Sequence, residues 1–99
     1  MYQYFSKLIP VRFCQKYRRD SEFIIVTNMA NKFLYLNNTA ADFFELCDGQ
    51  NTINDIVHIL LSEYDVEIDV LQRDIISIIR DFQWGKIIKL SKKKVSTVR

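Results

Sequence analysis

The stretch that decides the fold is Tyr35-Leu-Asn-Asn-Thr-Ala-Ala-Asp-Phe-Phe-Glu-Leu-Cys-Asp-Gly49, followed directly by Gln50-Asn-Thr-Ile-Asn-Asp-Ile56. Leu36-Asn37 closes an aromatic and aliphatic run, and the Asn side chain is expected to accept the first free N–H groups of a helix. Gly49 is expected to stop that helix, because glycine enters the left-handed conformation without a Cβ penalty. Four residues between these points recur at helical spacing and predict one apolar face: Ala40, Phe43, Phe44 and Cys47.

The pattern downstream predicts two further helices. Thr52 with Asp55 is a weaker form of the capping box, because Asp replaces Glu, and it opens a helix over about Ile53–Tyr64. The apolar stripe of this helix consists of Ile53, Ile56, Val57, Leu60, Leu61 and Tyr64. A third helix is expected over about Asp69–Trp84, where the Asp is the N-cap and Gly85 is the stop. Its core face consists of Leu71, Ile75, Ile78, Ile79 and Phe82.

The chain upstream of Asn37 favours strands. Alternating and β-branched runs predict three of them, at about Val11–Tyr17, Phe23–Thr27 and Lys32–Leu36. Polar turns are expected at 18–21 and 28–31, where Asn and Ser tolerate turn conformations. Short turns between neighbouring strands imply an antiparallel meander.

The length of 99 residues allows one domain. We expect an N-terminal lead-in over 1–9, a folded domain over 10–90 and a basic flexible tail over 91–99. Lys86–Leu90 is too short for a helix and is expected to form a strand or a wing. A three-stranded antiparallel β-sheet followed by three α-helices predicts an α+β, winged-helix-like fold. DNA-binding and peptide-binding modules share that architecture, so the fold alone does not decide the function.

The sequence shows no targeting signal. No apolar run approaches the roughly 18 residues that a membrane span needs, and the N-terminus lacks the features of a secretory signal. We therefore expect a cytoplasmic protein without a membrane partner.

Cys14 and Cys47 match no metal-ligand spacing, and a disulfide scaffold would carry more cysteines. Both are expected to be free thiols.

Residues for catalysis are sparse. His58 is the single histidine, and its spacing places it off the apolar stripe of the second helix, facing solvent. There is no second imidazole, no Cys-x-x-Cys and no Gly-rich phosphate loop in the sequence. The carboxylates are scattered along helix surfaces and caps, with no base beside a serine. We therefore expect no catalytic residue, no metal and no cofactor, and a protein that is not an enzyme.

DNA binding by a winged-helix regulator is the alternative function. Such a protein places a recognition helix in the major groove and needs basic residues against the phosphates. The third predicted helix is net acidic, with two arginines and three aspartates: Arg73, Arg80, Asp69, Asp74 and Asp81. Every charged residue after Asp81 is basic, so positive charge gathers in the tail instead. This distribution has the wrong sign for a groove-reading helix, and no nucleic-acid partner is expected.

Peptide binding fits the pattern better. A third strand at the sheet edge would present unpaired N–H and C=O groups to an extended peptide. Phe33 and Tyr35 point to the opposite face from Leu34 and Leu36. These aromatics supply contact area for a peptide or, alternatively, cover a hydrophobic patch or pack under the N-terminal segment. The third helix would form the other wall of the groove. The predicted peptide-binding residues are Lys32, Phe33, Leu34, Tyr35, Leu36, Val70, Arg73, Asp74, Ser77, Arg80 and Asp81.

The order of these elements resembles the PqqD family, the small peptide-recognition domains (RiPP recognition elements) of ribosomal peptide biosynthesis. That family shows a strand ending in Leu-Asn, a helix closed by Asp-Gly and two further helices, and this chain matches from about Phe33 to Ile88. The matching positions are Leu36-Asn37, Asp48-Gly49, Asp74-Ile75 and Gly85–Ile88. Gly85-Lys86-Ile87 stands where the family usually has Gly-Leu, and the Lys-rich tail lies outside the pattern.

The resemblance implies recruitment of a peptide rather than chemistry. The leader segment of a precursor peptide would dock as an extra strand against Lys32–Leu36, with the stripe over Val70–Asp81 as the other wall. The chain would act as a peptide chaperone that presents the precursor to a modifying enzyme in natural-product biosynthesis. A radical SAM enzyme, a leader peptidase or a cyclase is the partner that the resemblance implies.

Overall fold

Alternating apolar residues in three consecutive strands build the main sheet. The structure, a computed structural model, describes residues 2–94. Strands β2 (Lys16–Asp20), β3 (Phe23–Thr27) and β4 (Phe33–Asn37) pair antiparallel in the order β2–β3–β4. The register places Val26 opposite Leu34, and Ile24 opposite Leu36. The side chains of this face are turned to the helices and are buried or half-buried, since alternate residues of a strand point to opposite faces.

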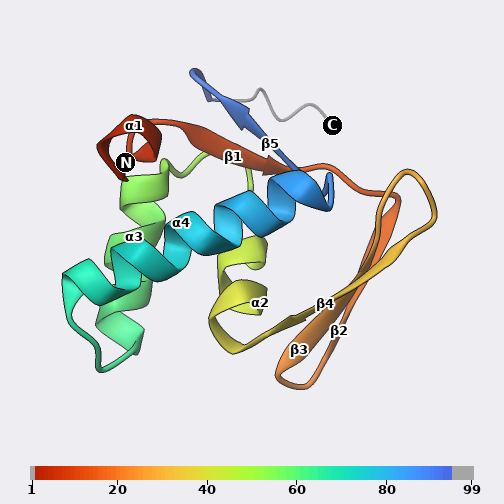
Figure 1. Cartoon of the computed structure of the whole chain (residues 1–99), viewed down its shortest axis with the longest axis horizontal. Helices are drawn as coiled ribbons and strands as arrows, with labels where there is room; N and C mark the ends of the chain where they lie inside the picture. The colour runs from red at the N-terminus through yellow and green to blue at the C-terminus, as the bar shows by residue number, and fades with distance from the viewer. Residues whose placement is uncertain (1, 95–99) are drawn as a thin grey trace.

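Three helices pack against that face and form the core with it. They are α2 (Asn38–Glu45), α3 (Ile53–Glu63) and α4 (Ile68–Trp84), and α4 runs across the middle of the molecule (Figure 1). Phe82 of α4 lies 5.7 Å from the ring of Phe43 and 5.8 Å from the ring of Phe44. The predicted α+β fold, with a three-stranded antiparallel sheet followed by three helices, is confirmed.

A second, two-stranded sheet joins the two ends of the chain. β1 (Ile9–Arg12) pairs antiparallel with β5 (Ile88–Ser91), on the other side of α4 from the main sheet (Figure 1). The prediction of one strand over Val11–Tyr17 is therefore wrong. The Phe13 N–H donates to the Ile87 carbonyl at 2.8 Å, so the chain leaves one sheet before it enters the other. Only a partner far away in sequence could reveal that break.

The boundaries of β2 also differ from the sequence expectation. The predicted turn over 18–21 is wrong, because Arg18–Asp20 belong to β2 and the turn centres on Ser21, whose φ is 62°. Pairing with the β-branched run of β3 overrides the polar composition of these residues. The predicted strand over Lys86–Leu90 corresponds to β5, which begins two residues later and runs to Ser91.

The first residues contribute to the core although the sequence suggested a lead-in over 1–9. A short helix, α1 (Tyr2–Phe5), places Phe5 in the core, and Ile9 is buried at the start of β1. Backbone bonds tie the segment to α3: the Ile53 N–H donates to the Leu8 carbonyl at 2.9 Å. At the other end, most of the expected tail over 91–99 lies outside the described residues, which end at Lys94.

The helix N-termini agree only in part with the predicted caps. Thr52 and Asp55 form the capping box, with each backbone N–H bonded to the other residue's side chain at 3.0 Å. Asn37 occupies the N-cap of α2, but its side chain makes no capping hydrogen bond, so that prediction is wrong. The N-cap of α4 is Glu67, two residues before the predicted Asp69, so that prediction is wrong.

The two glycines of the chain occupy positions with different structural constraints. Gly49 has a φ of 81°, in the left-handed region as predicted, but α2 ends at its right-handed C-cap Leu46, three residues earlier, so the prediction that Gly49 stops this helix is wrong. Gly85 is the C-cap of α4 but has a right-handed φ of −77°, and the left-handed residue is Lys86 with φ 60°. A Cβ on Gly85 would lie 2.3 Å from the Leu34 Cδ2 atom. Gly85 is therefore required by the close approach of β4 to the end of α4.

Candidate functional site

The edges of the three-stranded sheet differ in how well they are protected against pairing. β2 and β4 are the outer strands of this sheet. β2 carries Lys16, Arg18, Arg19 and Asp20, and charged side chains on an edge strand oppose pairing with another chain. β4 has the sequence Phe-Leu-Tyr-Leu-Asn and carries no charge. Of the two edges, β4 is the one that can accept a further strand.

The backbone groups on the free edge of β4 follow from the ladder with β3. The Asn28 N–H donates to the Lys32 carbonyl at 2.9 Å, which directs the backbone of Lys32 toward β3. Because N–H and C=O directions alternate along an antiparallel strand, Leu34 and Leu36 also bond to β3. The N–H and C=O groups of Phe33 and Tyr35 and the N–H of Asn37 therefore point outward from the edge, whereas the Asn37 C=O belongs to the N-cap of α2.

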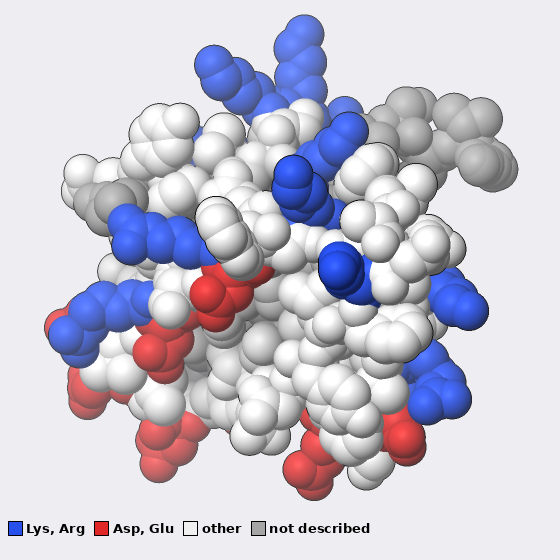
Figure 2. Space-filling model, turned by 45° about the vertical axis from the view of Figure 1, so that its right-hand side comes forward, with Lys and Arg blue, Asp and Glu red and all other residues white. Residues whose placement is uncertain are grey.

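A groove lies between the end of β4 and helix α4. It has a volume of about 410 Å³, and three segments line it: the end of β4, the first turn of α2 and the exposed side of α4. The lining residues are Asn37, Asn38, Thr39, Ala40, Asp74, Ser77, Ile78 and Asp81. Figure 2 shows this face of the molecule as hollowed in the middle. The groove thus continues the free edge of β4 toward α4.

The charge inside the groove is negative. Asp74 and Asp81 are its only ionisable lining residues, and Ser77 lies between them on the same side of α4. Within residues 2–94, neither carboxylate has a hydrogen bond or ion pair with another side chain. Acidic side chains border the hollow on the side of α4, and mostly uncharged side chains cover the side of the sheet (Figure 2).

The outer face of the sheet carries exposed aromatic rings. Phe33 is 73% exposed and Tyr35 is 72% exposed, so they do not pack under the N-terminal segment. The Tyr35 ring stacks on Phe23 of the neighbouring strand, with 5.3 Å between ring centroids. Since the helices cover the opposite face, these rings are open to a strand that pairs with β4.

The other predicted site residues lie away from the groove. Leu36 is buried in the core, and half-buried Leu34 packs against the end of α4. Lys32 immediately precedes β4, and its N–H donates to the Asn28 side chain at 3.0 Å. Val70 and Arg80 are exposed and do not line the groove. Arg73 lines a separate hollow with Tyr2, Asp69, Gln72 and Ile76, beside α1.

Sequence reasoning missed the floor of the groove. The sequence pattern places Ile78 on the core face of α4 and predicts the start of α2 only as a cap. The helical spacing could have identified Ile78, because it lies at the border between the core face and the polar stripe of α4. The start of α2 gave no such signal, since its position depends on how α4 crosses the sheet.

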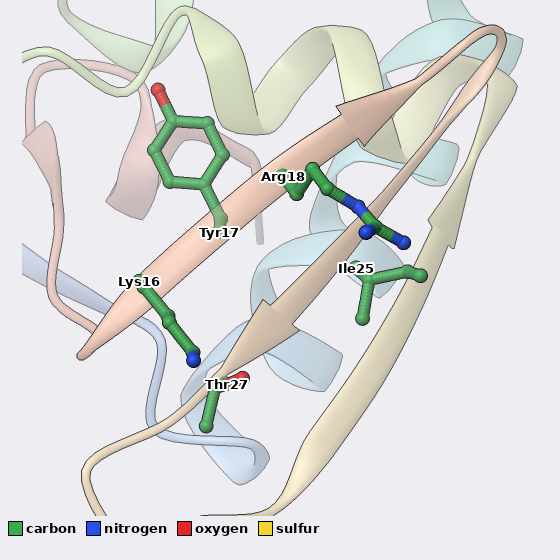
Figure 3. A pocket seen from close by; sticks show the side chains of 5 residues that line it. All are labelled: Lys16, Tyr17, Arg18, Ile25 and Thr27. Atoms are coloured by element: carbon green, nitrogen blue, oxygen red, sulfur yellow. The ribbon is translucent and has the colours of Figure 1, made fainter.

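A second hollow lies on the outer side of the β2–β3 hairpin. Its volume is about 210 Å³, and Lys16, Arg18, Ile25 and Thr27 line it together with Tyr17 (Figure 3). The register places Lys16 beside Thr27, and Arg18 beside Ile25. The Tyr17 ring points to the other side of the strand and packs edge-on against Phe44 at 5.1 Å. The hollow holds no nucleophile paired with a base.

The two cysteines and the histidine differ in their burial. His58 is exposed, as its spacing predicts. Both cysteines are free; burial raises the pKa of the Cys47 thiol, whose sulfur donates to the Phe43 carbonyl at 3.2 Å. Burial also raises the pKa of Cys14, although Arg12 opposes the shift. A raised pKa disfavours the reactive thiolate.

The ionisable and thiol side chains do not gather into a metal site in the described part of the chain. Residues 2–94 contain no group of three or more His, Cys, Asp or Glu side chains that could hold a metal ion. No helix described by the structure is both long and apolar enough to cross a bilayer.

Comparison with known proteins gives one family and one solved structure. The sequence model of the family described as "Coenzyme PQQ synthesis protein D (PqqD)" matches residues 22–88. The solved structure described as "TbiB1 in Complex with the TbiA(beta) Leader Peptide" superposes with a TM-score of 0.72 at 12% sequence identity. The match covers 80% of this chain and 95% of that chain, and it shows a shared fold. No curated protein matches the sequence.

Proposed function

Because the chain belongs to the PqqD family, we propose that it binds the leader segment of a ribosomally synthesised precursor peptide as an added strand on β4. The observation that carries the proposal is the uncharged free edge of β4 beside a groove. An edge of this kind is a template for pairing with another chain. The structural similarity to TbiB1, which was solved with a leader peptide, supports the same function.

Backbone hydrogen bonds would set the register of the bound peptide. The outward N–H and C=O groups of Phe33 and Tyr35, with the N–H of Asn37, are the partners that β4 offers. Side chains of the peptide would alternate between the groove and the outer face of the sheet, because successive residues of a strand point to opposite sides. Specificity would come from those side chains.

Binding of the leader would act by tethering. A peptide held on β4 keeps its remaining segment close to an enzyme that binds this chain, and the raised effective concentration needs no new catalytic group. A separate peptide-modifying enzyme, such as a radical SAM enzyme, a leader peptidase or a cyclase, would carry out the chemistry. The chain itself would contribute recognition.

The test is titration with a synthetic peptide that corresponds to the leader of the precursor encoded beside this gene. Amide NMR shifts should cluster at residues 33–40 and 74–81. Trp84 provides a second readout, because it is the single tryptophan, is 90% exposed and lies one turn beyond Asp81. Shifts confined to the basic C-terminal region, with a steep salt dependence and competition by duplex DNA, would contradict the proposal.

A matched pair of variants tests the backbone contribution. Tyr35→Pro removes an outward N–H without touching the ladder to β3, whereas Tyr35→Ala removes the ring and keeps the N–H. The proline variant should bind the leader about tenfold more weakly than the alanine variant, since one or two backbone hydrogen bonds of about 1 kcal/mol each are lost. Equal affinities of the two variants would exclude strand addition at this position.

A further inference from the structure

The two sides of an added strand on β4 would meet surfaces of opposite character. One side faces the groove, where Asp74 and Asp81 are the only ionisable lining residues. The other side continues the outer face of the sheet, next to the exposed rings of Phe33 and Tyr35. The carboxylates belong to a helix and the rings to a strand, and one peptide bound on β4 would contact both.

Asp81 lies in a position that is unfavourable for the helix itself. The C-terminal end of a helix carries a partial negative charge, and basic residues in the last turn normally offset it. The last turn of α4 contains no basic residue and begins with Asp81. Within the described residues, no side chain pairs with this carboxylate. Proteins retain such local conflicts at functional sites, where a ligand can offset them.

The spacing of the two carboxylates suits one cation between them. Asp74 and Asp81 are two helical turns apart, about 10 Å along the axis at 1.5 Å per residue. Ser77 lies between them and adds a hydroxyl that can accept a hydrogen bond. A Lys or Arg that enters the groove opposite Ser77 would lie about 5 Å along the axis from each carboxylate, so both negative charges attract it.

We propose that the peptide recognised by this chain is an alternating strand with a Lys or Arg facing α4 and apolar side chains facing Phe33 and Tyr35. The inference rests on the proposed function, because it specifies which class of leader segment pairs with β4. The basic side chain lies between Asp74 and Asp81, over the apolar floor formed by Ala40 and Ile78. The apolar side chains form cross-strand pairs with the two exposed rings.

The test is a selection that does not require the natural leader. A display library of random 12-residue peptides is selected on the full chain and, in parallel, on the double variant Asp74→Asn/Asp81→Asn. Both substitutions keep the shape of an exposed side chain. The matched control is Asp65→Asn/Asp69→Asn, which removes the same charge from exposed positions outside the groove.

Peptides selected on the unaltered chain should carry Lys or Arg at one position and apolar residues at the two adjacent positions. Their affinity should fall about tenfold on the groove variant, because the basic side chain loses the attraction of two carboxylates, and remain within about twofold on the control. Exchange of the basic residue for Glu in the peptide should give a loss of similar size.

The remaining outcomes separate this inference from the proposed function. Selected peptides that shift the amides of 33–37, but show no basic preference and bind the groove variant equally, would overturn the inference and leave strand addition intact. Selected peptides that bind without shifting these amides, or a selection that enriches nothing, would overturn both.

Discussion

Neighbouring residues of β4 differ in whether they stabilise the sheet or offer groups for pairing, because their backbone groups point in opposite directions. The N–H and C=O groups of Leu34 bond to β3, while those of Tyr35 face outward. The side chains of the two residues also point to different faces of the sheet: Leu34 packs toward the core, and Tyr35 lies on the outer face. A substitution in this strand therefore acts on stability or on pairing according to its position.

We predict that Leu34→Pro destabilises the protein far more than Tyr35→Pro. Proline at Leu34 removes a ladder hydrogen bond to β3 and leaves its acceptor unpaired, which should cost about 1–3 kcal/mol of unfolding free energy. Proline at Tyr35 lies at an edge position where no ladder bond is lost, so its cost should be smaller. Urea unfolding of both variants measures the difference, and similar costs would contradict the assigned directions.

We predict coupling between Gly85 and Leu34. Gly85→Ala places a Cβ 2.3 Å from the Leu34 Cδ2 atom, which forces that side chain to move and should cost about 1 kcal/mol. In a Leu34→Ala background the clash is absent, and Gly85→Ala should become neutral or stabilising because alanine lowers the entropy of the unfolded chain. A double-mutant cycle of unfolding free energies gives the coupling; strict additivity would refute it.

We predict an alkaline loss of stability that depends on Tyr64. Burial, with a hydrogen bond from its hydroxyl to the Asp42 carboxylate, raises the pKa of Tyr64 from 10.0 to about 12. The folded pKa is raised, so the contribution is complete below pH 10 and is lost as the pH rises to about 12. Thermal unfolding from pH 9 to 12 should show a smaller decline for Tyr64→Phe than for the unaltered chain.

At the scale of whole elements, bonds at their ends fix how the helices and strands meet. The Arg12 guanidinium of β1 donates to the Phe44 carbonyl at 3.2 Å and to the Glu45 carbonyl at 2.6 Å, at the end of α2. Arg19 of β2 pairs with Asp42 of α2 at 3.3 Å. These contacts hold the second half of α2 against β1 and β2.

We predict that Thr52→Ala costs about 1 kcal/mol of unfolding free energy. The Thr52 hydroxyl accepts the Asp55 N–H in the capping box at the start of α3, and loss of an N-cap typically has this effect. Thr52→Ser keeps the hydroxyl and should lie close to the unaltered chain. A cost of Thr52→Ser equal to that of Thr52→Ala would argue against capping as the cause.

At the scale of the whole molecule, charge is separated between two ends. Lys and Arg gather at the end formed by β1 and β5, and Asp and Glu gather toward the opposite end (Figure 2). On the basic end the Lys89 ammonium lies over the Phe13 ring at 4.1 Å. The exposed stripe of α4 belongs to the acidic part, which is the reverse of what a recognition helix in DNA needs.

We predict that the N-terminal residues are required for full stability of the whole chain. Phe5 is 8% exposed and belongs to the core, so Phe5→Ala should cost about 3 kcal/mol of unfolding free energy. Tyr4→Ala is the matched control, because Tyr4 is 75% exposed and its loss should stay within about 0.5 kcal/mol. Equal effects of the two would contradict the packing of α1.

The sequence by itself determined the three helices, the β3–β4 hairpin, the capping box at Thr52 and the left-handed Gly49. These features depend on residues that are close in the chain, so periodicity and turn chemistry suffice to predict them. Only the tertiary structure decided that the predicted first strand is divided into β1 and β2, and that β1 pairs with β5. It also decided that Phe5 enters the core and that Gly85 makes room for Leu34. It also decided that Asn37–Ala40 and Ile78 share a groove with Asp74 and Asp81. These arrangements join segments far apart in sequence, and their geometry follows from the packing of α4 across the molecule, which no local pattern encodes.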